Sequence, residues 1–385
     1  MPRHPSIAPA IQGMTGSVYS ALAGRIASLE GEVYSLHVGD TWMSPPVGLR
    51  LQDVHQSEFP AVHKYANPHG HAPLLEALVD KVRARNAIPI EGASNILITP
   101  GATGALHGAA AATVAPGDEV LIVAPYWPLI RGVVQSCNAV PVDLPLWGIF
   151  DDADAVAAVF DAHVTDRTVA IYVSTPSNPT GRVLSEPVLA VLAERAARHN
   201  LWVWSDEVYE DYNYVSPHVS IGSLIPDRVL TAFSFSKAYG MSGHRCGYLV
   251  GPASVMRPVR KSTTYAWYST PTGAQILAER ALRDGQEWVA AARASYEETG
   301  RAAAARLGQP APDGSTFLFL DVADQLDDRG LVGFLEGCLE DNLILAPGSS
   351  FGSAYGTYVR VCFTCSPPEV VLRGVDKLAS RLGIA

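Results

Sequence analysis

The stretch SFSKAYGMSGHRCGY, residues 234–248, contains the most informative chemistry in this 385-residue sequence. It follows Val229–Phe233, a short apolar run that predicts a buried strand. Lys237, one of only five lysines in the chain, lies in this Ser- and Gly-rich turn. A lysine in a partly desolvated site can form a Schiff base with a carbonyl compound. Arg245 can clamp a phosphate with two parallel hydrogen bonds.

Short apolar runs alternate with amphipathic stretches through the middle of the chain. The expected buried strands are Ile96–Thr99, Val120–Ala124, Val169–Val173, Leu201–Trp204, Val229–Phe233 and Gly247–Val250. The expected helices include Pro73–Ala84, Thr103–Val114 and Pro187–His199. This alternation predicts a mostly parallel sheet with helices on both faces. In such a sheet, ligands bind at the carboxyl ends of the strands.

The last hundred residues differ in character. Pro271–Ala305 is rich in Ala, Arg and Glu and predicts long helices, and the strand-like runs Thr316–Leu320 and Tyr358–Phe363 follow. We therefore expect an α/β fold whose large domain, residues 45–275, contains a central, mostly parallel seven-stranded sheet. A smaller α+β domain would combine the N-terminal arm, residues 1–44, with residues 276–385. A chain of this length suits two domains.

The turns after the expected strands contain further candidate residues. Pro100–Gly104 leads into a helix whose N-terminus can bind an anion. Tyr126 and Trp127 can stack on a flat ring, and Asn178 can donate a hydrogen bond from a proline-rich turn. Asp206 ends an apolar strand, where a carboxylate is costly to bury without a cation. Each feature also has a purely structural interpretation. Pro100–Gly104 could be a tight turn, and the two aromatics could belong to the core. Asn178 could be an ordinary turn residue, and Asp206 could be a helix N-cap.

Three motifs occur in a fixed order: SNPTG at 177–181, SDEVY at 205–209, and SFSK at 234–237 followed by Arg245. With them, the sequence resembles the class I/II aminotransferase family, which consists of fold type I enzymes that depend on pyridoxal 5′-phosphate (PLP). The resemblance extends from about Gly39 to Arg360. It implies the fold expected above and a PLP cofactor.

The resemblance also implies a role for each matching residue. Lys237 would bind PLP as a Schiff base and move the substrate proton, Asp206 would keep the pyridine nitrogen protonated, and Tyr209 would bond the ring's phenolic oxygen together with Asn178. The remaining implied cofactor contacts are Trp127 on the ring, Gly101, Ala102, Thr103, Ser234, Ser236 and Arg245 around the phosphate, and Tyr65 from the partner subunit of a homodimer. The substrate α-carboxylate would bind Arg360, Asn178 and the backbone at Gly39.

The implied activity is ping-pong transfer of an amino group from an L-amino acid to a 2-oxo acid. Relatives specific for dicarboxylates place a second cation in the stretch matching Ser262–Thr272, or a lysine at the position of Thr103, and this chain has neither. Aspartate is therefore not the expected donor. Tyr265, Trp267 and Tyr268 suggest either a pocket for a larger aromatic or hydrogen-bonding side chain, or packing at a dimer interface.

Two other functions use the same scaffold. A PLP-dependent lyase or synthase, which performs elimination, replacement, decarboxylation or cyclisation, would use the same lysine, aspartate and arginine. A non-enzymatic PLP-binding regulator would carry a DNA-binding module ahead of the fold. Only about forty residues precede the expected cofactor domain, and they show no helix-turn-helix pattern or basic stripe.

Composition limits the partners and the location. The net charge is −10 and there is no dense Lys/Arg run, which argues against nucleic acid. No stretch approaches the ~20 apolar residues of a membrane helix, and the N-terminus does not resemble a signal peptide. Five scattered cysteines fit a reducing cytoplasm.

No metal site is expected. His63, His69 and His71 cluster in one segment, but no cysteine or acidic ligand accompanies them. Cys362 and Cys365 form a CxxC motif within an expected strand region, where residues three apart point to opposite faces. A shared metal or redox site is therefore not expected for them either.

Overall fold

The computed structural model describes residues 6–14 and 19–384. At its centre is a seven-stranded sheet in the order β2-β8-β7-β6-β5-β3-β4. Its strands are β2 (Ile96–Thr99), β3 (Glu119–Ala124), β4 (Val140–Pro145), β5 (Thr168–Ser174), β6 (Trp202–Asp206), β7 (Val229–Ser234) and β8 (Gly247–Val250). Strand β8 is antiparallel to β2 and β7, and the other pairs are parallel. The predicted α/β fold with a mostly parallel seven-stranded sheet is confirmed.

The sequence identified six of these strands and missed β4. This strand contains Pro141 and Pro145, and it lies at the edge of the sheet, paired only with β3. Proline lacks an N–H and is tolerated in sheets mainly at edges. Its side chains are mostly half-buried or exposed, so it lacks the continuous apolar run that marks the central strands.

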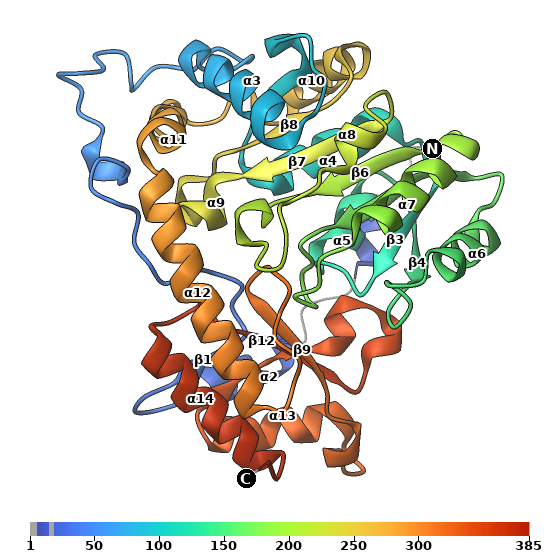
Figure 1. Cartoon of the computed structure of the whole chain (residues 1–385), viewed down its shortest axis with the longest axis vertical. Helices are drawn as coiled ribbons and strands as arrows, with labels where there is room; N and C mark the ends of the chain where they lie inside the picture. The colour runs from blue at the N-terminus through green and yellow to red at the C-terminus, as the bar shows by residue number, and fades with distance from the viewer. Residues whose placement is uncertain (1–5, 15–18, 385) are drawn as a thin grey trace.

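Helices cover both faces of the sheet (Figure 1). Alternate residues of β3 enter different cores: Ile122 packs in the cluster that contains Leu106, whereas Leu121 packs in the cluster that contains Leu189. The first face is covered by α4 (Gly101–Thr113), α5 (Leu129–Ser136) and α10 (Ala253–Trp267). The opposite face is covered by α6 (Ala153–His163), α7 (Glu186–Arg198) and α8 (Ile221–Leu224), and toward β2 and β8 by α3 (Ala72–Asn86) and α11 (Thr272–Asp284).

The C-terminal part packs around a second, three-stranded antiparallel sheet in the order β11-β12-β9. Its strands are β9 (Phe317–Asp321), β11 (Ala346–Pro347) and β12 (Tyr358–Cys362), and its helices are α12 (Gln286–Arg306), α13 (Gly330–Glu340) and α14 (Pro368–Arg381). Helix α12 runs from beside α11 down to α14 (Figure 1). The predicted long helices of Pro271–Ala305 thus correspond to α11 and α12.

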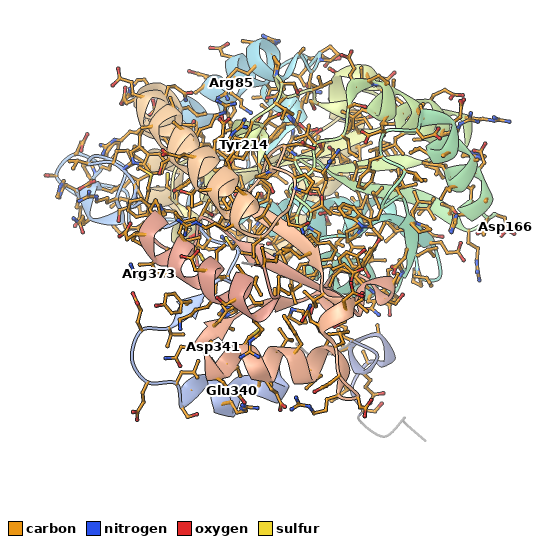
Figure 2. All side chains as sticks on the ribbon, turned by 60° about the horizontal axis from the view of Figure 1, so that its bottom comes forward. Arg85, Asp166, Tyr214, Glu340, Asp341 and Arg373 are labelled. Atoms are coloured by element: carbon orange, nitrogen blue, oxygen red, sulfur yellow. The ribbon has the colours of Figure 1, made fainter. Side chains whose placement is uncertain are left out.

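The N-terminal segment joins this C-terminal part. It contains α1 (Pro9–Gln12), α2 (Tyr19–Ala27) and β1 (Tyr34–Ser35), and β1 pairs in parallel with β10 (Leu343–Ile344). Arg373 of α14, labelled in Figure 2, forms an ion pair with Glu32, and Leu36 is fully buried in the same core. This packing agrees with a small domain built from both ends of the chain, and its limits, 1–44 with 276–385, stay a prediction.

Candidate active site

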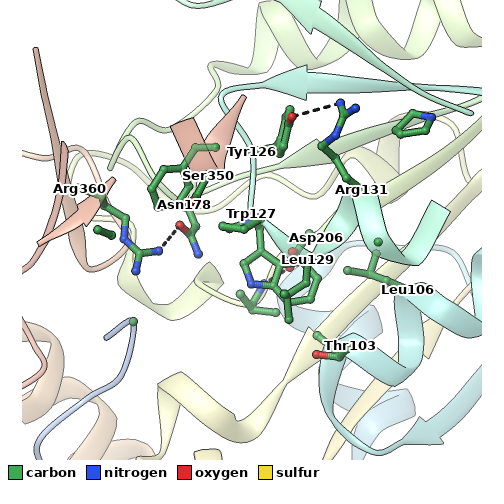
Figure 3. A pocket seen from close by; sticks show the side chains of 18 of the residues that line it. Thr103, Leu106, Tyr126, Trp127, Leu129, Arg131, Asn178, Asp206, Ser350 and Arg360 are labelled. Atoms are coloured by element: carbon green, nitrogen blue, oxygen red, sulfur yellow. Dashed lines mark hydrogen bonds between the residues drawn. The ribbon is translucent and has the colours of Figure 1, made fainter. Parts of the chain in front are cut away.

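A chamber of about 1200 Å³ opens at one edge of the large sheet (Figure 3). The carboxyl ends of the parallel strands meet at this edge, as the rule for open α/β sheets requires. The predicted site residues that line it are Gly39, Ala102, Thr103, Trp127, Asn178, Asp206, Tyr209, Ser234, Ser236, Lys237, Arg245 and Arg360. Gly101 lies beneath them in the first turn of α4, and Tyr65 lies outside the chamber.

Arg245 reaches this edge because β8 runs against its neighbours. It precedes β8, and the amino end of an antiparallel strand lies beside the carboxyl ends of the others; in register, Gly247 faces both Ser234 and Thr99. Arg245 has a left-handed backbone, with φ of 54°. A Cβ on Gly101 would lie 2.5 Å from Nη2 of Arg245. Glycine is therefore required at position 101 if the guanidinium is to lie against the start of α4.

Asp206 is the last residue of β6, and its carboxylate is buried between β5 and β7. It accepts hydrogen bonds from the hydroxyl of Tyr172 at 2.7 Å and from the backbone N–H of Val208 at 3.4 Å. Burial raises the pKa of this carboxyl group to about 6. Within residues 6–14 and 19–384, no lysine, arginine or histidine forms an ion pair with it. Asp206 is not a helix N-cap, because the next helical turn begins only at Glu210.

Lys237 lies on α9 (Phe235–Ala238), a single turn that begins directly after β7. The turn is stabilised by Ser234, whose hydroxyl oxygen accepts a hydrogen bond from the backbone N–H of Ser236 at 3.1 Å. The amine of Lys237 donates to the backbone oxygen of Gly39 and lies 3.4 Å from Oδ1 of Asp40. The lysine therefore reaches across the chamber to the N-terminal segment.

Arg360 is buried on β12 at one end of the chamber. Its Nη1 donates to Oδ1 of Asn178 at 2.8 Å, and its Nη2 donates to the backbone oxygen of His37 at 2.7 Å. The ring of Phe317 lies 4.2 Å from the guanidinium, as a cation–π contact. The resemblance assigned both Asn178 and Arg360 to the substrate α-carboxylate, but the bond between the two side chains was not foreseen.

The middle of the chamber is aromatic, and its far end is charged. Figure 3 shows Trp127 between Arg360 at one end and Arg131 at the other. Arg131 donates to Asp143 at 2.6 Å and to the hydroxyl of Tyr126 at 3.3 Å. Tyr126 thus bonds the arginine, while Trp127 remains available as a stacking wall. The sequence did not single out Arg131 or Asp143, because neither lies in a recognisable motif.

Tyr209 closes the chamber beside Asp206. Its side chain is 3% exposed and meets the ring of Phe317 edge-on, with centroids 5.7 Å apart. Burial raises the pKa of the Tyr209 hydroxyl, so this group stays protonated and can donate a hydrogen bond.

The remaining predicted aromatics lie on the surface. Tyr65 is 87% exposed and packs edge-on against Tyr268, with ring centroids 5.1 Å apart, and Tyr265 is 85% exposed. Trp267 contacts the ring of His107 on α4. Within the described protomer, none of Tyr265, Trp267 and Tyr268 lines the chamber. The pocket interpretation of these residues has no support in a single protomer, whereas the exposure of Tyr265 and Tyr268 fits interface packing.

The interpretation of the CxxC motif rested on a wrong premise. Cys362 ends β12, but Cys365 lies in the bend beyond it, where its thiol donates to the backbone oxygen of Cys362 at 3.3 Å. The two residues therefore do not alternate across a strand, and both are free thiols. No group of three or more histidine, cysteine, aspartate or glutamate side chains is arranged for a metal in the part of the chain that the structure describes. None of the described helices is both long and apolar enough to span a bilayer.

Comparisons with known proteins place this geometry in a family. The family model described as aminotransferase class I and II matches residues 34–378. A probable aspartate/prephenate aminotransferase of Thermus aquaticus is 32% identical over 83% of this chain and 84% of its own. An arginine–pyruvate transaminase of Pseudomonas aeruginosa is 31% identical over 83% of this chain and 84% of its own length. A solved double mutant of Thermus thermophilus aspartate aminotransferase superposes with a TM-score of 0.89 at 27% identity, over 98% of this chain and 100% of that one. The chain belongs to the class I and II aminotransferase family.

Proposed function

We propose that this aminotransferase binds PLP through Lys237 and transfers amino groups between L-amino acids and 2-oxo acids. The observation that carries the proposal is Asp206, a buried carboxylate with a raised pKa and, among the described residues, no cationic partner. A protonated aromatic nitrogen would supply the missing charge. The family relationship makes aminotransfer the expected reaction.

The other polar groups of the chamber fit the remaining parts of PLP. The start of α4 offers backbone N–H groups, and Ser234, Ser236 and Arg245 offer side-chain donors, which together suit a phosphate. Gly101 lets these groups approach one another. Trp127 supports a flat ring from one side, and the amine of Lys237 is available for an aldehyde. When bound, PLP supplies an electron sink for the substrate carbanion.

The residues of the chain have distinct tasks in this proposal. Arg360 binds the substrate α-carboxylate through a two-pronged hydrogen bond, with its guanidinium held by Asn178 and the backbone of His37. Lys237 removes the proton from the α-carbon of the substrate and returns it on the cofactor side, which is general acid–base work by a group already in place. Asp206 holds a proton on the ring nitrogen, and Tyr209 donates to the ring's phenolic oxygen.

We propose that aspartate is not the preferred donor. Thr103 lines the chamber where one subgroup has lysine, and Ser262–Thr272 contains no cation. Arg131, at the far end, is paired with Asp143, so its charge is already compensated. The names of the relatives mention different amino donors, aspartate in one and arginine in another. The donor of this chain must therefore be argued from its own residues.

We further propose a homodimer located in the cytoplasm. Tyr65 and Tyr265 are large and almost fully exposed, as is Val47 at 81%. The hydroxyl of Thr272 donates to the backbone oxygen of Lys64, so the segments around Tyr65 and Tyr268 form one surface. A second copy of the chain would cover this surface, with Tyr65 entering the partner's site. Five free cysteines support a reducing compartment.

The test is the absorbance spectrum of the purified protein with PLP, before and after addition of single amino acids. We expect a visible band that Lys237→Ala removes, and that a good donor bleaches while a 2-oxo acid is released. Release of ammonia or carbon dioxide without this 2-oxo acid would favour the lyase or synthase. Absence of the band in the unchanged protein would refute the proposal.

A further inference from the structure

Asp40 is an acidic residue beside the amine of Lys237 that the motifs did not single out. It comes from the N-terminal segment, 197 residues from the lysine in sequence, and its Oδ1 lies 3.4 Å from Nζ of Lys237. Its side chain is 42% exposed, and that of Lys237 is 16% exposed. The contact therefore lies at the open side of the chamber, where a charge can be accommodated without full desolvation.

The carboxylate of Asp40 is held in place from two further directions. Its Oδ1 accepts from the backbone N–H of Thr41 at 2.9 Å, and its Oδ2 accepts from the hydroxyl of Ser242 at 3.1 Å. Its backbone oxygen accepts from the hydroxyl of Thr364 at 2.7 Å. Both carboxylate oxygens are thus oriented, and the side chain has little freedom to leave the lysine.

The backbone oxygen of Gly39 is a second acceptor for the amine of Lys237. Two acceptors from adjacent residues fix the end of a long side chain that has several rotatable bonds. The amine is then directed across the chamber at the times when no covalent bond holds it. This situation arises in each half-reaction, after the substrate has displaced the lysine.

We propose that Asp40, oriented by Ser242, is a positioning residue that holds the free amine of Lys237 ready to move the substrate proton. The inference rests on the proposed function, because it assigns the lysine its catalytic role. A purely structural alternative is that Asp40 only ties the N-terminal segment to the loop at Ser242. That role would not depend on the presence of Lys237.

The test uses Asp40→Asn, which keeps the size of the side chain and one acceptor oxygen but removes the charge. Asp376→Asn is the matched control, since Asp376 pairs with Arg306 on the distant surface of α14. We expect the cofactor-free Asp40→Asn protein to form the covalent link to PLP about tenfold more slowly than the unchanged protein, because the amine exchanges a charged acceptor for a weaker, neutral one. In stopped-flow mixing with a good donor, the maximal bleaching rate should fall about tenfold, while the donor concentration at half-saturation changes less than twofold. Ser242→Ala should shift both rates in the same direction, by less.

A double variant separates positioning from structure. In a Lys237→Ala background, Asp40→Asn should leave the Kd for non-covalently bound PLP within twofold, because Asp40 acts through the lysine. An equal loss of PLP binding in both backgrounds, or unchanged capture and bleaching rates, would overturn the inference alone. If reductive trapping and peptide mass analysis find no PLP on Lys237 of the unchanged protein, the proposed function itself is refuted. The role of Asp40, which depends on that function, is then refuted as well.

Discussion

Asp206→Asn should stabilise the cofactor-free protein while weakening its hold on PLP. Asparagine is uncharged, and its carbonyl oxygen can still accept the hydrogen bond from Tyr172 that Asp206 accepts at 2.7 Å. Burial raises the pKa of Asp206 from 3.8 to about 6, so folding favours the protonated acid. The stabilising effect of that proton is complete below the unfolded pKa and is lost as the pH rises through the folded one. Well above pH 6, burying the charged form of Asp206 costs about 3 kcal/mol, because its pKa rises by about two and each step of one in pKa corresponds to about 1.36 kcal/mol.

The measurement is urea unfolding of the cofactor-free variant and the unchanged protein between pH 4 and pH 8. The difference in unfolding free energy should stay below about 1 kcal/mol at pH 4 and should grow to about 3 kcal/mol in favour of asparagine by pH 7. The other carboxylates contribute equally to the pH dependence of both proteins, so their contribution cancels when the two unfolding free energies are subtracted. With saturating PLP the order should reverse, because only the aspartate can pair with a protonated ring nitrogen. Equal stability at pH 8 without cofactor, or a difference that shrinks as the pH rises, would refute the reasoning.

Three further perturbations follow from the same geometry. Arg360→Lys loses the two-pronged contact and the bond to Asn178, so kcat/KM should fall about 100-fold in steady-state assays while the Kd for PLP stays the same. Gly101→Ala would place a methyl group 2.5 Å from Nη2 of Arg245, on a residue whose φ of 73° disfavours alanine. Equilibrium dialysis should show at least about tenfold weaker PLP binding. Unchanged binding would mean that the guanidinium does not hold the phosphate. His218→Ala leaves Glu207 buried without the partner that lies 2.8 Å away, and urea unfolding at pH 6 should show a loss of about 3 kcal/mol.

Much of the site could be predicted because its residues follow the strands directly. Asn178, Asp206 and Lys237 each lie at or within a few residues of the end of a parallel strand. Once a parallel sheet is inferred, strand ends that are far apart in sequence must meet at one edge. Local order and one topological rule were therefore enough to group these side chains without knowing any distance between them.

What the sequence could not predict depends on long-range packing. Arg360 meets Asn178 across 182 residues, and Lys237 meets Asp40 across 197. Such contacts depend on how the C-terminal part and the N-terminal segment pack against the large sheet. The helical and strand periodicities of the sequence report only local structure and do not predict this packing. Cys365 was misplaced for a local reason, since β12 ends at Cys362 and the alternation of a strand stops where the strand stops.

Two residues of the candidate site violate the ordinary preferences of a folded chain. Asp206 is a buried carboxylate without a described cation, and Arg245 has a left-handed backbone although it is not glycine. The buried charge of Asp206 is unfavourable in the protein alone and would become favourable beside a protonated nitrogen. The conformational cost at Arg245 would be offset when its guanidinium binds a phosphate. A ligand that binds only the folded state adds its binding free energy to stability. The cost of the buried Asp206 charge is therefore recovered on binding, and part of the stability that PLP adds at neutral pH should come from this one carboxyl group.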